Sequence, residues 1–418
     1  MSHPAWMTLF LQLGVMLLIG VASGQLARRV GLPTLFGELL GGVVLGPTVF
    51  GALAPGLHAA LFPPGGPVPT ATSAIVNLGM LLFLFTAGLE VNLGAVSSRA
   101  RSIGLTSLFG IAAPMLAGIA CVHAFPRLWG PQALARPGLF ALYIGTALSI
   151  SALPVIARTL MELDLLRHPL GTVVMAAATI DDLLGWALFA TILSRFGASE
   201  AEAAGPLLVV GKTVAFIAVT LVAGRLLGAP ALRLVRRQLP WPGGLLSATV
   251  VLVLLASAAA ELLGFHAVFG AFFAGVALAD RDAEGNEAHA TIRRFVGGFF
   301  SPLYFVSLGL LADFSHSFAP VLVAVVVALA CAGKLGGATL GGRLGGMPAR
   351  DALAVAFGLN ARGAMEMIVA SVALQAGIIG APVFVALIVM ALVTSMMSGP
   401  AMAALLGLRR IPAKPQVE

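Results

Sequence analysis

The segment Thr179-Ile180-Asp181-Asp182-Leu183-Leu184-Gly185-Trp186 places two adjacent carboxylates inside an otherwise apolar stretch that runs from Leu170 to Leu193. Acidic side chains are costly inside a membrane and usually serve a function there. Consecutive helical residues point about 100° apart, so one carboxylate can face a cavity while the other faces a partner helix. A helix break or an interfacial loop is the alternative, but the apolar flanks continue for about ten residues on both sides. We therefore expect a membrane helix whose two acids have separate roles.

The composition around this segment is that of a membrane protein. Hydrophobic residues make up 59% of the 418 residues and charged residues 10%, too little polar surface for a soluble globule of this size. The chain has fifty glycines and 25 prolines, and many of them lie within apolar runs, as in closely packed membrane helices. Cys121 and Cys331 lie within apolar runs without metal-ligand spacing. The net charge of +7 comes from scattered residues rather than a basic tract, so no nucleic-acid partner is expected.

Thirteen apolar segments are each long enough, or nearly so, to cross a bilayer. They are 6–27, 32–51, 74–96, 102–124, 138–160, 170–193, 206–228, 243–262, 264–280, 294–313, 318–342, 349–376 and 381–407. Strand-like alternation is not evident, which argues against a membrane barrel. The sequence therefore predicts an all-α polytopic protein with 13 transmembrane helices.

The basic residues predict the orientation of these helices. The loops after odd-numbered segments, the segment ends that border those loops, and the C-terminal tail together hold 18 of the 24 Lys and Arg residues. Because cytoplasmic loops carry an excess of Lys and Arg, the N-terminus is expected outside and the C-terminus in the cytoplasm. No soluble regulatory domain is expected after the last segment of this chain.

Two short matches indicate an internal repeat. Phe36–Leu45 resembles Phe269–Leu278, and Gly88–Leu93 resembles Gly309–Phe314. Under the predicted topology, each first copy runs opposite to its second copy, so the halves would be inverted repeats. Chance similarity among Gly-, Leu- and Ala-rich helices competes with either match alone, but both matches occur in the same order.

Two segments at corresponding places in the halves carry helix breaks. The first contains Ser149, Ser151 and Pro154, and a proline disfavours helical geometry at the residue before it. The second contains the polar, glycine-flanked stretch Gly358–Glu366, which includes Asn360. A pair of interrupted helices is the best sequence indication of a transporter binding site, because freed carbonyls and half-helix ends can hold an ion.

Three further charges lie deep in the predicted segments. Arg362 and Glu366 are one helical turn apart and are expected to neutralise each other, mainly as a structural pair; direct ion ligation by Glu366 is the alternative. Lys334 lies about 16 residues into its segment, too deep to reach the interface. A buried ammonium needs a carboxylate, and Asp181 or Asp182 is the expected partner.

These residues together resemble the monovalent cation:proton antiporter superfamily, in its sodium/proton branch with a double aspartate. The matching motifs are Asp181-Asp182, Lys334, Asn360–Glu366, Ser151–Pro154, Gly37-Glu38 with Gly46-Pro47, and Leu84–Glu90. The resemblance implies that Asp182 binds the cation or proton, that Asp181 pairs with Lys334, and that both acids hold the transported Na⁺. Potassium-selective, glutathione-gated relatives typically carry a different residue before the ion-binding aspartate, and relatives often have threonine where Ser149 and Ser151 stand.

The resemblance also implies a fold of two bundles with two crossing broken helices. A scaffold that dimerises would comprise residues 1–101 and 243–317, and a core with the ion site would comprise 102–205 and 318–418. Residues 206–242 would hold the linking helix.

The function that follows is electrogenic exchange of Na⁺ for H⁺ by alternating access, in a homodimer in the cell membrane of a prokaryote and in contact with lipid. No enzymatic activity and no cofactor are expected. K⁺/H⁺ or mixed exchange shares the same motifs and stays open. An intramembrane aspartyl protease is a remote alternative, because its two acids must come from different helices. A non-transporting sensor or channel is another.

Overall fold

The computed structural model describes residues 2–29, 33–89, 100–165, 168–197, 206–228, 230, 234, 238, 243–279 and 290–408. Within these ranges the chain is helical and contains no strand. Ten helices are long and apolar enough to cross a membrane. The three remaining predicted segments are represented by the shorter apolar helices Pro137–Ala147, Ala267–Ala277 and Met365–Gln375. The predicted all-α polytopic fold is thus confirmed. Glu90 and the predicted tail after Leu408 lie outside the described residues.

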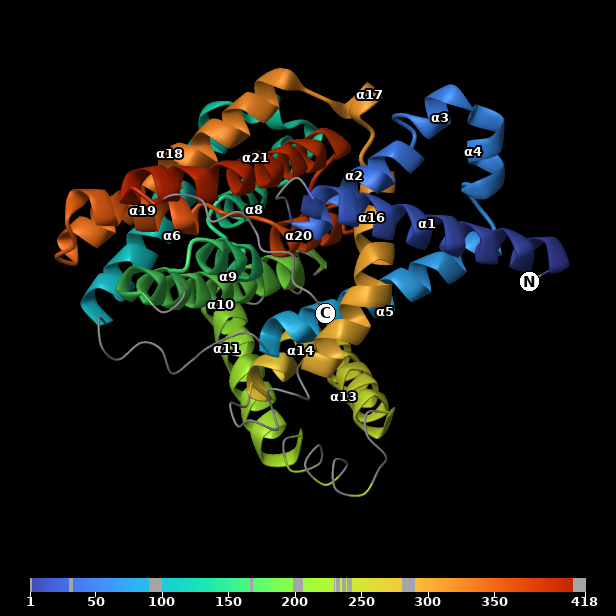
Figure 1. Cartoon of the computed structure of the whole chain (residues 1–418), viewed down its shortest axis with the longest axis horizontal. Coiled ribbons are helices and arrows are strands. Elements are labelled where there is room, and N and C mark those ends of the chain that lie inside the picture. The colour runs from blue at the N-terminus through green and yellow to red at the C-terminus, as the bar shows by residue number, and fades with distance from the viewer. Residues whose placement is uncertain are drawn as a thin grey trace. The chain divides into compact units, whose positions relative to one another are not determined.

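The chain divides into two compact units (Figure 1). Unit 1 comprises Met1–Val91 and Leu193–Ser315, and unit 2 comprises Asn92–Ile192 and His316–Glu418. The helices of unit 1 are α1 (His3–Arg29), α2 (Thr34–Leu45), α3 (Phe50–Leu53), α4 (Pro55–Leu61), α5 (Pro67–Leu89), α11 (Pro206–Ala223), η3 (Gly224–Gly228), α13 (Gly243–Leu262), α14 (Ala267–Ala277), η4 (Val296–Phe300) and α16 (Ser301–Leu311), with α17 (Phe314–Ser317) at its boundary. The helix assigned by sequence to the link, α11, falls in unit 1.

The helices of unit 2 are α6 (Ala100–Ala124), η1 (Pro126–Trp129), α7 (Pro131–Ala135), α8 (Pro137–Ala147), α9 (Leu153–Glu162), α10 (Pro169–Gly197, to Ile192), α18 (Pro320–Leu344), α19 (Ala349–Leu359), α20 (Ala364–Gln375) and α21 (Ala381–Leu406). Helix α18 packs along α6 and also contacts α19 and α21, while α8 packs on α6. Because small residues let helix backbones approach closely, the glycines of α18 explain this contact. A Cβ on Gly333 would lie 2.5 Å from the Cα of Pro114, and a Cβ on Gly337 would lie 2.2 Å from the carbonyl oxygen of Phe109.

The internal repeat is visible in the packing of unit 1. Helix α2 meets α16 where Gly42 lies against Gly309, and α14 meets α5 where Gly275 lies against Gly88. In the sequence matches, Gly42 corresponds to Gly275 and Gly88 corresponds to Gly309. One helix contact therefore occurs twice, built from equivalent glycines. An internal repeat predicts this recurrence, whereas chance similarity between two helix sequences does not.

A second pair of close helix contacts extends the repeat to α1 and α13, which the sequence matches did not include. A Cβ on Gly37 of α2 would lie 2.1 Å from the carbonyl oxygen of Ser23 in α1. A Cβ on Gly270 of α14 would lie 2.2 Å from the carbonyl oxygen of Ala256 in α13. Ser23 and Ala256 are separated by the same number of residues as Gly37 and Gly270, so α1 corresponds to α13.

Replacing Gly88 by alanine is expected to destabilise unit 1. The added Cβ would lie 2.2 Å from the carbonyl oxygen of Phe272, which is backbone and cannot turn away. Overpacking of this kind costs about 1–3 kcal/mol, so the melting temperature in detergent should fall by several degrees. The control is Gly14→Ala in α1, where no atom lies within 4 Å of the added Cβ. Equal melting temperatures for the two variants would contradict the close helix approach.

Candidate functional site

The site is built around two broken helices in unit 2. Helix α8 ends at Ala147 and α9 begins at Leu153, while α19 ends at Leu359 and α20 begins at Ala364. Pro154 lies in the first turn of α9, a position that needs no backbone donor. The extended segments between the half-helices meet, because the amide of Ala152 donates to the carbonyl oxygen of Ala361 at 2.9 Å. The two predicted breaks and their crossing are therefore confirmed.

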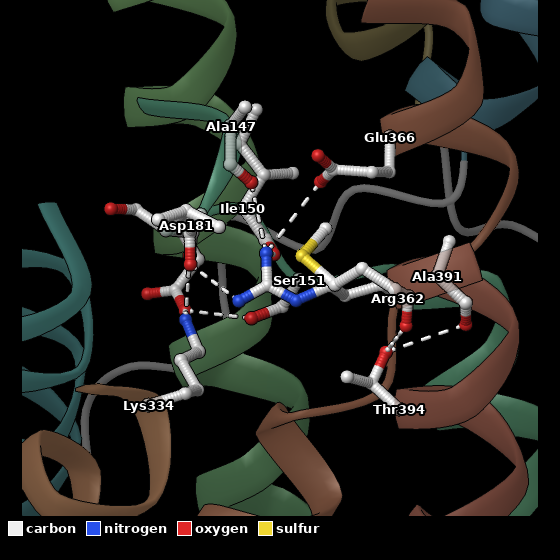
Figure 2. Close-up of polar contacts among 12 residues, drawn as sticks. Ala147, Ile150, Ser151, Asp181, Lys334, Arg362, Glu366, Ala391 and Thr394 are labelled. Carbon is white, nitrogen blue, oxygen red and sulfur yellow. Dashed lines mark hydrogen bonds and ion pairs between the residues drawn. The ribbon is translucent and has the colours of Figure 1, made fainter. Parts of the chain in front are cut away.

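Arg362 holds the crossing together by donating to buried carbonyl oxygens at the C-terminal end of α8 and in the break that follows it. Its guanidinium donates to the carbonyl oxygens of Ala147 at 2.9 Å, Ile150 at 3.3 Å and Leu148 (Figure 2). The side chain is buried, and Nη1 lies 3.7 Å from Oε2 of Glu366. A cation at a helix C-terminus is favoured by the helix dipole. The sequence indicated that carbonyls freed at the break can hold an ion; three of the carbonyls there are bound by Arg362.

Asp181 is held by groups from three parts of unit 2. Lys334 of α18 lies with Nζ 2.5 Å from Oδ2 of Asp181 and 2.7 Å from the carbonyl oxygen of Ser149, to which it donates. The hydroxyl of Ser151 donates to Oδ2 at 3.0 Å, and that of Ser107 in α6 donates to Oδ1 at 2.7 Å. Both charged side chains are fully buried. Figure 2 shows the lysine pointing at the carboxylate.

Asp182 follows on α10 and is 1% exposed. Adjacent positions on a helix point in different directions, so the two acids cannot act as a shared-proton dyad on one atom. Among the residues that the structure describes, no group of three or more His, Cys, Asp or Glu side chains could hold a metal ion.

Asn360 lies apart from these contacts. It caps α19 and is fully buried, and its amide nitrogen is 3.6 Å from Sγ of Cys331 and 3.9 Å from Sδ of Met397. Sulfur is a weak hydrogen-bond acceptor, so these two contacts hold the Asn360 amide only weakly. That Asn360 lines the ion site at the break stays a prediction.

Two buried polar residues have contacts that the sequence did not predict. Ser107 was not identified, because a single serine in an apolar helix usually bonds its own backbone and carries no signal of its own. Glu38 appeared in the sequence only as part of the Gly37-Glu38 motif; in unit 1 it is 6% exposed and accepts a hydrogen bond from Ser301 at 3.3 Å. The close packing of α2 against α1 and α16 buries it.

A buried ammonium on oxygen ligands at the crossing of two broken helices, inside a polytopic membrane protein, is typical of ion transporters, in which charged groups inside the membrane mark the ion path. The family described as "Sodium/hydrogen exchanger, transmembrane" matches residues 14–407. The chain belongs to this family of transporters, and it is not an enzyme.

Individual relatives agree with this membership. The chain is 31% identical over 393 residues to Na(+)/H(+) antiporter NhaS4 of Synechocystis sp., covering 92% of this chain and 94% of that one. It is 31% identical over 405 residues to Cation/H(+) antiporter 17 of Arabidopsis thaliana, covering 94% of this chain and 47% of that one. The chain therefore spans about half the length of the Arabidopsis relative and nearly all of the Synechocystis one.

The fold is also that of a solved antiporter. The sodium proton antiporter MjNhaP1 from Methanocaldococcus jannaschii superposes with a TM-score of 0.68 over 96% of this chain and 98% of that one. At 14% sequence identity, this similarity establishes the fold alone.

Proposed function

We propose that this chain exchanges Na⁺ for H⁺ by alternating access, with Asp182 and Asp181 as the cation- and proton-binding groups. Family membership supports cation/proton antiport as the class of function. The observation that carries the proposal is the Lys334 ammonium, which donates to the carbonyl oxygen of Ser149 and to Oδ2 of Asp181, the residue that precedes Asp182 in the chain. These oxygens are hard ligands of the kind that a small monovalent cation requires, and a protein cation holds them in this structure.

Exchange follows from competition for those oxygens. An arriving Na⁺ that is ligated by Asp182, Asp181 and the Ser149 carbonyl takes the place of the ammonium. An ammonium without its carboxylate is strongly disfavoured in a low-dielectric site, so Lys334 would release its proton. Protonation of the site would reverse the exchange. Since Asp182 can release a second proton, more than one proton would leave per Na⁺ and transport would be electrogenic.

K⁺/H⁺ or mixed exchange is the second candidate, because the same oxygen ligands can serve a larger cation. The name of the Arabidopsis relative specifies no particular cation. Purified protein in vesicles with an internal pH dye tests both candidates. Addition of Na⁺ should drive proton movement, whereas proton movement with K⁺ and none with Na⁺ would support the second candidate. No proton movement with Na⁺, K⁺ or Li⁺ would reject antiport itself.

We further propose that unit 2 is the moving core and that unit 1 is the scaffold through which two copies form a homodimer in a prokaryotic cell membrane. The site lies wholly in unit 2, whereas the helices assigned by sequence to the scaffold, such as α1, α5 and α13, lie in unit 1. Cross-linking of purified protein in lipid tests the dimer. A monomer at all protein concentrations would reject it.

The charge bias predicts the orientation of the chain. With the C-terminal tail in the cytoplasm, a reporter that is active only in the cytoplasm should be active when it is fused after Glu418. The same reporter inserted in the loop between α4 and α5, at Gly65, should be silent, because that loop is expected outside. The opposite pattern would overturn the predicted topology.

A further inference from the structure

We infer that Ser107 of α6 is a positioning residue of the cation site: its hydroxyl holds one oxygen of Asp181 so that the other oxygen faces Lys334 and the arriving cation. The inference rests on the proposed antiport and extends it to a helix that none of the sequence motifs includes.

The two oxygens of Asp181 have different partners. Oδ2 is 2.5 Å from the ammonium of Lys334 and 3.0 Å from the hydroxyl of Ser151. Oδ1 accepts from the hydroxyl of Ser107 at 2.7 Å, a distance typical of a strong hydrogen bond to a charged acceptor. A carboxylate bonded on one oxygen alone can rotate about its terminal torsion, which is broad. The bond from Ser107 therefore fixes which oxygen is presented to the ion.

The position of Ser107 is itself fixed by packing. The residue is 1% exposed, and α6 lies tightly against α18, where Gly337 and Gly341 contact the α6 backbone. Helix α18 also carries Lys334. The donor to Oδ1 and the ammonium at Oδ2 thus come from two helices in direct contact, which keeps the spacing between the two partners of Asp181 constant.

The charged neighbours of Asp181 do not replace this bond. Lys334 bonds the other oxygen, Oδ2, and Arg362 donates to carbonyl oxygens at the crossing. Asp182 follows Asp181 on α10 and has the same sign of charge. When a cation displaces the ammonium, Oδ2 loses its strongest partner while the bond to Oδ1 stays. Ser107 then preserves the orientation of the carboxylate through the exchange, so its loss should weaken cation binding more than it slows turnover.

The test is Ser107→Ala in the reconstituted protein, with Na⁺-driven proton movement measured over a range of Na⁺ concentrations. Loss of a hydrogen bond to a buried charged group should raise the apparent KM for Na⁺ about 10-fold, with the maximal rate reduced less than about twofold. Ser107→Thr, which restores the hydroxyl, should return the KM to within about twofold of the wild-type value.

Ser102→Ala is the matched control on the same helix. Its hydroxyl donates to the carbonyl oxygen of Gly345 at 2.7 Å, away from Asp181. This variant should keep the wild-type KM even if its melting temperature falls. The inference is overturned if Ser107→Ala keeps the wild-type KM, or if it changes the melting temperature and the maximal rate while KM stays constant. Absence of exchange by the wild-type protein would reject the proposed function instead, so the two failures are distinguishable.

Discussion

Asp182→Asn is expected to abolish cation/proton exchange while the protein remains folded. A group that exchanges H⁺ for a cation must be able to lose its proton and carry the resulting charge, and an amide can do neither. The side chain is 1% exposed and the two residues have nearly the same size, so packing is preserved. Na⁺-driven proton movement in vesicles should fall to the level of protein-free vesicles, and the melting temperature should stay close to that of the wild type.

Asp164→Asn provides the control for this result. Asp164 is an exposed residue of unit 2 with a φ of 55°, a backbone conformation that asparagine tolerates well. Exchange by this variant should equal that of the wild type. Robust exchange by Asp182→Asn, at any pH, would remove Asp182 from the proposed mechanism.

Lys334→Gln is expected to remove the response of transport to membrane potential. If Lys334 releases a proton in each turnover, the exchange moves net charge, and each net charge contributes about 2.3 kcal/mol per 100 mV. The glutamine variant cannot supply that proton and should exchange without net charge. It should also be less stable, because breaking a buried ion pair typically costs about 3–5 kcal/mol. Current on a solid-supported membrane, recorded beside a melting curve, measures both effects.

A purely structural role for Lys334 gives a different pattern. The variant would then melt at a lower temperature but move the same charge per cation as the wild type. Lys212→Gln is the control, since Lys212 lies exposed on α11 in unit 1. That variant should match the wild type in both measurements. Unchanged charge movement in Lys334→Gln would exclude the lysine from proton coupling.

The sequence by itself determined the fold class and the breaks. Apolar length decides whether a helix can cross a bilayer, and this property is local, so thirteen segments were found without knowledge of their neighbours. Pro154 and the glycines around Asn360 interrupt a helix through their own backbone chemistry, which is also local. The deep charges Asp181, Asp182 and Lys334 stood out because each is costly inside a membrane without a partner.

The tertiary structure decided how those parts are joined. Ser107 carries no signal in the sequence, and its role appears once α6 is packed on α18 and its hydroxyl meets Asp181. The burial of Glu38 likewise depends on the helices that surround α2.

The partners of the carbonyls at the end of α8 and in the break after it show the same division. The sequence indicated that the break would free carbonyl oxygens, but Arg362 reaches those of Ala147, Leu148 and Ile150, and Lys334 reaches that of Ser149. These contacts join residues about 200 positions apart. Hydrogen bonds act over about 3 Å, so which distant donor meets a freed acceptor is set by helix packing rather than by the residues near the break.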